Sequence, residues 1–127
     1  MEPREAHYPG RPPIDAYGNG GFRFAGMSHL GSLLFLPSGV YAWPVAASKD
    51  ITVTALNRVM AEARLIEILV LGCGDEIDNP SPAVKSALET RGVALEFMRT
   101  GPAARTYNVL LAEDRAVAAA LIAVENS

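Results

Sequence analysis

Two arginines in the C-terminal third of the chain stand where a protein could bind an anion. Arg99 and Arg105 flank a Thr-Gly-Pro segment that is typical of a helix start. A helix N-terminus offers free N–H groups, and arginine adds a charged donor fork. If the two preceding strands are parallel neighbours, loops 72–75 and 99–106 lie at one sheet edge, where open α/β sheets bind ligands. The same residues also suit helix capping and core packing, so both roles stay open.

Gly72 and Gly74 follow an apolar run, which invites comparison with a dinucleotide-binding turn. The pattern is incomplete, because the third glycine of that fingerprint would fall at Ile77. Asp75 and Glu76 would also repel a pyrophosphate at the position where it would have to approach. A tight turn at the end of a strand explains the two glycines better, although they remain candidates for a binding surface.

Four further residues are candidates for a binding surface. Tyr107 and Asn108 lie on the helix that is expected to begin near residue 100. Tyr41 and Trp43 alternate along a predicted strand, so they face the same side of its sheet. Tyrosine and tryptophan are enriched in protein interfaces, but a core position fits Trp43 at least as well.

The sequence contains no catalytic or metal-binding motif. Cys73 is the one cysteine, which excludes an intramolecular disulfide, and its glycine and acidic neighbours give no reason for a lowered thiol pKa. His7 and His29 have no second ligand at metal-binding spacing, and no GxSxG nucleophile motif is present. We therefore expect no catalytic residue, no metal and no cofactor.

The composition indicates one folded domain. The chain has 127 residues, of which 50% are hydrophobic and 20% charged, and this excludes an intrinsically disordered protein. The net charge of −3 argues against nucleic acid or anionic membranes as partners. Residues 1–13 contain four prolines and no apolar leader, so we expect a flexible tail before a single domain at 14–127. The longest apolar run, 116–124, is shorter than the roughly 20 residues of a membrane span, so we expect a cytoplasmic protein with no membrane insertion.

The N-terminal half predicts antiparallel strands, and the C-terminal half alternates helices with strands. A hairpin is expected over 14–25, and a second one has strands at 32–36 and 40–43 around a turn that ends at Gly39. Further elements are expected as follows: a helix from about 50 to 64, a strand over 66–71, a helix over 82–91, a strand over 93–98, a helix over 100–113 and a last helical stretch over 115–124. The unit 66–98 should be a right-handed βαβ crossover. The fold class is thus α/β, with a mixed sheet.

Several of these segments together resemble a known family. They are Ile14–Gly18, Phe22–Phe24, the hairpin Gly31–Pro44, Leu71–Gly74, and the stretch from Thr100 through Thr106-Tyr107-Asn108 to Ile122. The chain resembles a bacterial and archaeal family of unknown function that is similar to the mitochondrial NADH dehydrogenase (complex I) assembly factor 3. This resemblance implies a three-layer α/β fold with a mixed central sheet and no established enzyme activity. It also implies protein partners, with respiratory complex I subunits among the candidates.

Two functional hypotheses follow. The first is a non-enzymatic interaction or assembly protein, supported by the resemblance and by the apolar stretch 116–124, part of which could face a partner as a helix. The second is a small anionic ligand or nucleotide site at loops 72–75 and 99–106, supported by Arg99 and Arg105.

Overall fold

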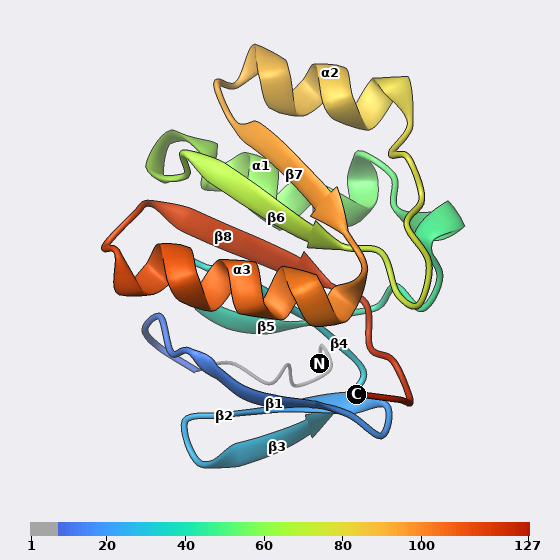
Figure 1. Cartoon of the computed structure of the whole chain (residues 1–127). Coiled ribbons are helices and arrows are strands. Elements are labelled where there is room, and N and C mark those ends of the chain that lie inside the picture. The colour runs from blue at the N-terminus through green and yellow to red at the C-terminus, as the bar shows by residue number, and fades with distance from the viewer. Residues whose placement is uncertain (1–7) are drawn as a thin grey trace, which may run out of the picture.

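The computed structural model describes residues 8–127 as two β-sheets with helices packed around the larger one (Figure 1). The smaller sheet is antiparallel and has the order β1 (Ile14–Gly18), β2 (Gly21–Phe24), β3 (Met27–Leu30). The larger sheet consists of β4 (Ser32–Leu36), β5 (Gly39–Trp43), β6 (Ile68–Gly72), β7 (Ala94–Met98) and β8 (Val117–Leu121), in the order β5-β4-β8-β6-β7. The predicted hairpin over 14–25 is confirmed, but its continuation into β3 was not predicted.

The larger sheet is mixed, as the sequence predicted. β4 pairs antiparallel with β5 and with β8, while β6 pairs in parallel with β7 and with β8. The predicted strand-helix-strand unit is present, with α2 (Pro82–Thr90) connecting β6 to β7. The α2 helix begins as its sequence predicts, because the Ser81 hydroxyl accepts a hydrogen bond of 3.2 Å from the Val84 N–H and Pro82 occupies the first turn.

The prediction of a helix over 115–124 is wrong, because this segment contains β8. All five residues of β8 are buried, and the strand lies between β4 and β6 in the middle of the sheet. A central strand is covered on both faces and is therefore apolar throughout. Its three alanines, at 118–120, favour a helix by intrinsic propensity, but pairing with two neighbouring strands overrides that preference. Because this segment is a buried strand, it presents no helical face to a partner.

The helix expected between residues 50 and 64 is broken into short pieces. The α1 helix covers only Asn57–Ala61, and short 3-10 helices stand at Ser48–Asp50, Thr54–Leu56 and Ala63–Leu65. The Thr52 hydroxyl accepts the Ala55 N–H at 3.1 Å, a local turn that competes with a regular helix start. The α3 helix, over Thr100–Ala112, agrees with its prediction.

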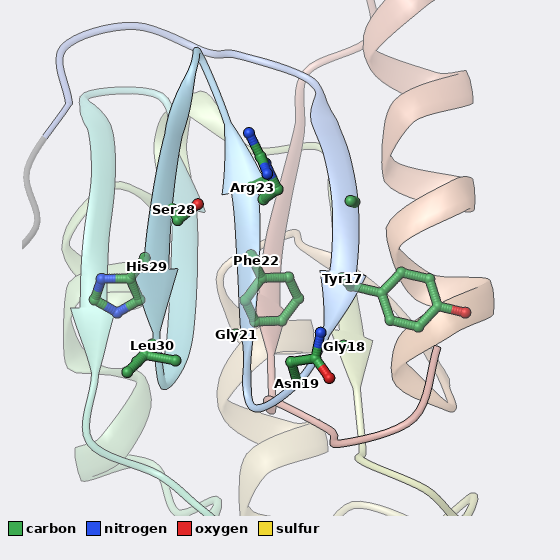
Figure 2. Close-up of a pocket in the computed structure, with 10 residues that line it drawn as sticks. Tyr17, Gly18, Asn19, Gly21, Phe22, Arg23, Ser28, His29 and Leu30 are labelled. Carbon is green, nitrogen blue, oxygen red and sulfur yellow. The ribbon is translucent and has the colours of Figure 1, made fainter.

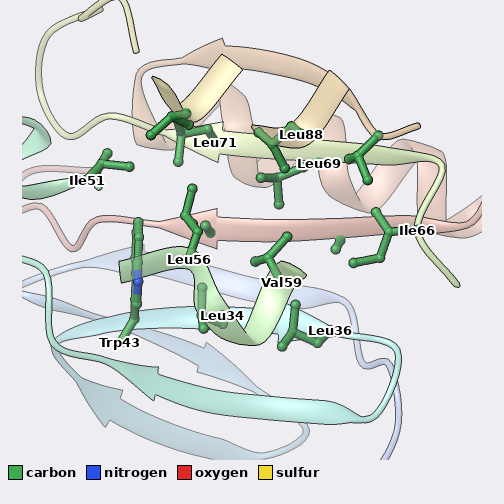
Figure 3. Packing of buried hydrophobic residues seen from close by; sticks show 14 of the residues in the cluster. Leu34, Leu36, Trp43, Ile51, Leu56, Val59, Ile66, Leu69, Leu71 and Leu88 are labelled. Atoms are coloured by element: carbon green, nitrogen blue, oxygen red, sulfur yellow. The ribbon is translucent and has the colours of Figure 1, made fainter. Parts of the chain in front are cut away.

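The larger sheet forms the middle of three layers. Buried side chains from alternate positions of β4 divide between two hydrophobic clusters: Leu34 and Leu36 join one, and Leu33 and Phe35 join the other. The first cluster contains side chains from α1 and α2 (Figure 3). The second contains side chains from α3 and from the smaller sheet. The expected three-layer α/β fold is confirmed.

The segment before β1 contacts the domain from Tyr8 onward. Tyr8 forms an isolated antiparallel bridge with Val40, and the Arg11 guanidinium donates to the carbonyl oxygens of Arg115 (3.2 Å) and Val117 (2.9 Å). These contacts differ from the loose tail expected over 1–13, and the first seven residues of that tail lie outside the described residues. No helix between residues 8 and 127 is long and apolar enough to cross a membrane.

Candidate functional site

The two loops that the sequence singled out lie together at one edge of the larger sheet. β6 and β7 are parallel neighbours, so loops 72–75 and 99–106 follow adjacent strand ends. The Gly74 N–H donates to the Thr100 hydroxyl at 3.0 Å, and the Thr100 N–H donates to the Gly74 carbonyl, also at 3.0 Å. The prediction that these loops meet is confirmed.

Thr100 connects three segments at this edge. Its side chain is fully buried, and its hydroxyl donates a hydrogen bond of 2.6 Å to the carbonyl of Ile122 while accepting the one from Gly74. Gly72 packs against the same residue, since a Cβ at position 72 would stand 3.0 Å from the Thr100 hydroxyl and 2.8 Å from Leu121 Cδ2. Gly72, which the sequence suggested for a binding surface, is therefore a position where the backbone packs closely against Thr100, and it does not line the hollow described next.

A hollow of about 230 Å³ lies beside the start of α3. Gly74, Asp75, Arg99 and Arg105 contribute to its lining, and so does Tyr17 from β1. Arg99 and Arg105 are exposed and form no ion pair with another residue between 8 and 127. The structure thus brings together three of the predicted site residues, Gly74 and the two arginines.

The N-terminus of α3 has few donors left for an anion. The Thr100 N–H bonds to Gly74, Pro102 has no N–H, and the Ala103 N–H donates to the Arg99 carbonyl at 3.0 Å. At most one N–H of the first turn, that of Gly101, remains for a ligand. The Asp75 carboxylate also lines the hollow and would repel an anion.

Tyr107 and Asn108 do not belong to this hollow. Tyr107 is buried, its hydroxyl donates to the Pro12 carbonyl at 3.4 Å, and burial raises its pKa to about 12, against a smaller lowering effect of the Arg11 charge. The Asn108 amide is paired with the backbone of Ile14, accepting from its N–H and donating to its carbonyl, both at 2.8 Å. Both side chains hold the N-terminal segment and β1 against α3.

Tyr41 and Trp43 lie apart from the hollow as well. Trp43 is buried, and its indole N–H donates to the Ala55 carbonyl at 2.8 Å, so it is a core residue. Tyr41 is partly buried, its hydroxyl lies 2.6 Å from the Ser38 hydroxyl, and Arg58 stacks over its ring at 4.3 Å.

Cys73 is a buried residue at the end of β6. Burial raises the pKa of its thiol, and the thiol donates a weak hydrogen bond of 3.5 Å to the Asp78 carbonyl. A thiol in this state reacts slowly. Between residues 8 and 127, no group of three or more histidine, cysteine, aspartate or glutamate side chains is arranged to hold a metal ion.

A second surface was missed by the sequence analysis. A hollow of about 280 Å³ lies over β1, β2 and β3 (Figure 2) and is lined by residues that include Tyr17, Arg23, Ser28 and Leu30. Tyr17 extends from β1 toward α3 and lines both hollows. The available signal was the Ala25-Gly26 turn after Phe24, which continues the hairpin into one more strand.

The fold defines a small α/β domain with a three-stranded antiparallel sheet and a five-stranded mixed sheet. A family model described as "Protein of unknown function (DUF498/DUF598)" matches residues 14–122, and the chain belongs to this family.

Its relatives include bacterial and mitochondrial proteins. An uncharacterised protein of Rhodobacter capsulatus is 40% identical over 122 residues, which cover 96% of this chain and 93% of the relative. The human NADH dehydrogenase [ubiquinone] 1 alpha subcomplex assembly factor 3 is 37% identical over 109 residues, which cover 86% of this chain and 59% of the human protein. The chain therefore spans well under two thirds of that relative. Among solved structures, one from Bartonella henselae, described as an outer membrane protein, superposes with a TM-score of 0.91 at 50% identity and covers 94% of this chain and 100% of that one.

Proposed function

We propose that this protein is a non-enzymatic interaction domain that helps to assemble a respiratory NADH dehydrogenase. The observation that carries the proposal is the 37% identity with complex I assembly factor 3 over 86% of this chain. The family model supports it, because it spans both sheets and α1–α3. We further propose a cytoplasmic location, which fractionation of the native host tests.

The use of polar side chains at the predicted site supports a binding role over a catalytic one. Thr100 and Asn108 are engaged in hydrogen bonds that hold segments of the fold together. Tyr107 is buried and its hydroxyl donates to the Pro12 carbonyl, so it is also engaged within the fold. The accessible features of the described residues include the hollow beside α3 and the hollow over the smaller sheet.

The direct test is to tag the chain in its native host and identify the proteins that co-purify. We expect subunits of the peripheral arm of NADH dehydrogenase to be enriched, and deletion of the gene to reduce the assembled complex on native gels. A tagged protein of similar size and charge serves as the control. Normal assembly in the deletion strain, with none of these subunits enriched, would contradict the proposal.

A second candidate function is binding of a small anion at the hollow beside α3. The observation that favours it is the convergence of Arg99 and Arg105 on that hollow. A thermal-shift screen with inorganic phosphate and nucleotides tests it, because a ligand at 100 times its dissociation constant stabilises the folded state by about 2.7 kcal/mol. Arg105→Ala should abolish that shift, while Arg64→Ala, at another exposed arginine, should preserve it.

A further inference from the structure

The outer strand of the smaller sheet has an edge that no other segment of residues 8–127 pairs with. Among the described residues, β3 pairs only with β2. Unpaired backbone groups at such an edge form a template for another strand, and proteins usually block them with lysine, proline, a bulge or a covering segment. β3 reads Met-Ser-His-Leu in regular register with β2 and has no lysine, proline or bulge. At the other sheet, by contrast, Tyr8 bridges the outer strand β5 at Val40.

The backbone of β3 is oriented to accept a partner strand. The Gly31 N–H donates to the Gly20 carbonyl at 2.7 Å, which marks one hydrogen-bonded pair of the ladder. Antiparallel pairs alternate between hydrogen-bonded and open. The N–H and C=O groups of Ser28 and Leu30 therefore turn toward the free edge.

Two large apolar side chains of this strand are exposed. Leu30 is 80% exposed and Met27 is 42% exposed. The exposure of Leu30 has a structural cause in its register partner, Gly21. A Cβ at position 21 would collide with the His29 carbonyl, so position 21 has to be glycine and offers Leu30 no side chain to pack against.

The same surface carries positive charge. Arg23 lies between the buried residues Phe22 and Phe24, so its side chain points outward, and it forms no ion pair with another residue between 8 and 127. Its register partner is the small residue Ser28, which leaves space between the guanidinium and the edge. Strands lie about 5 Å apart, so an added strand would run about 10 Å from β2, within joint reach of an arginine and a glutamate side chain. No carboxylate lines the hollow beside these residues.

We propose that the β3 edge binds an extended segment of a partner protein, which adds a fourth strand to the smaller sheet. Ser28 and Leu30 are two positions apart and share a face, so the segment carries an acidic residue opposite Ser28 and an apolar residue opposite Leu30. The inference rests on the proposed interaction function and names its surface. Charge complementarity favours a foreign acidic segment over a second copy of this chain, because self-pairing would bring two Arg23-bearing edges together.

Titration with defined peptides, followed by NMR on the isotope-labelled chain, tests this surface. The probe is a threonine-rich octapeptide with glutamate and leucine two residues apart, and the matched control has glutamine in place of glutamate. With the glutamate peptide at millimolar concentration, we expect the largest amide shifts at residues 27–30. We expect binding about threefold weaker for the glutamine peptide, because an ion pair exposed to solvent contributes little. No shifts in β3, or shifts centred on the hollow beside α3, would overturn the proposal, and so would dimer formation through β3 in the absence of peptide.

Substitutions separate the backbone contribution from the charge contribution. Ser28→Pro removes an edge N–H and should weaken both peptides at least tenfold, whereas Arg23→Gln should weaken only the glutamate peptide. Leu30→Ser should lower the affinity. Leu65→Ser should not, because Leu65 is 64% exposed in the 3-10 helix Ala63–Leu65, which is not part of the smaller sheet. Arg64→Gln serves as the charge control. Equal loss in the control variants would overturn the proposal, and the thermal midpoint of each variant shows that it is folded.

Co-purification with the same variants distinguishes this inference from the proposed function. If wild-type protein enriches NADH dehydrogenase subunits and Ser28→Pro and Arg23→Gln enrich them equally, the proposed function stands and the β3 surface is wrong. If wild-type protein enriches none of them, the proposed function fails, whatever the peptides do.

Discussion

Replacing Thr100 by valine should be among the most destabilising isosteric changes in this domain. The substitution keeps the side-chain shape but removes the hydroxyl that satisfies the Gly74 N–H and the Ile122 carbonyl. Each buried backbone group left without a partner costs about 1–3 kcal/mol, so the expected loss of unfolding free energy is about 3 kcal/mol. For a domain of this size, that corresponds to a fall in the thermal midpoint of about 10 °C.

Urea denaturation of wild type and three variants tests the expected loss of unfolding free energy. Thr100→Ser keeps the hydroxyl and loses one methyl group, which costs about 1 kcal/mol. Thr106→Val is the control, because the Thr106 hydroxyl makes only a 3.5 Å contact with the Met98 sulfur, and the variant should stay within about 1 kcal/mol of wild type. If Thr100→Val proved no less stable than Thr100→Ser, the hydroxyl would not hold these segments together and the reasoning would be refuted.

Four other predictions concern the stability of the fold and the reactivity of Cys73. Leu121→Asp should give a protein unfolded by circular dichroism, because it buries a carboxylate in the central strand β8, and a folded variant would contradict that position. Gly39→Val should cost more than about 1 kcal/mol, since Gly39 has a φ of +146°; an unchanged urea midpoint would show that the turn tolerates a side chain. Above pH 10 the phenol of Tyr107 ionises in the unfolded chain but stays protonated in the folded one up to its pKa of about 12; wild type should therefore lose about 1.4 kcal/mol more than Tyr107→Phe between pH 9 and pH 11, and equal losses would place the phenol in solvent. Cys73→Ser should retain fold and partner binding, and native Cys73 should react with a thiol reagent far more slowly than the unfolded chain; equally fast reaction would mean that the thiol is exposed.

The elements with strong local signals could be predicted from the sequence. The hairpin of β4 and β5 combines two apolar runs with a Pro-Ser-Gly turn, and α2 has both a capping serine and a first-turn proline. The meeting of loops 72–75 and 99–106 was also predictable, since the carboxyl ends of parallel strands share one sheet edge.

What could not be predicted depended on partners far away in the chain. β8 is rich in alanine, and only its pairing with β4 and β6 makes it a strand. In the sequence, Asn108 is simply a polar residue on a predicted helix. In the structure, its side-chain amide forms hydrogen bonds with the backbone of Ile14. β3 contains no β-branched residue, so propensity did not indicate it.

The central position of β8 also determines the order in which this domain can be completed during synthesis. β8 is the last strand along the described chain, yet it joins β4 on one side and β6 on the other, with Leu34 pairing to Ala120. Until Val117–Leu121 has emerged from the ribosome, the nascent chain holds two separate half-sheets, β5-β4 and β6-β7, each with an unpaired edge. Contacts between such distant residues close slowly. The edges of β4 and β6 in the growing chain are therefore exposed to mispairing until residues 117–121 have been synthesised and can pair with both.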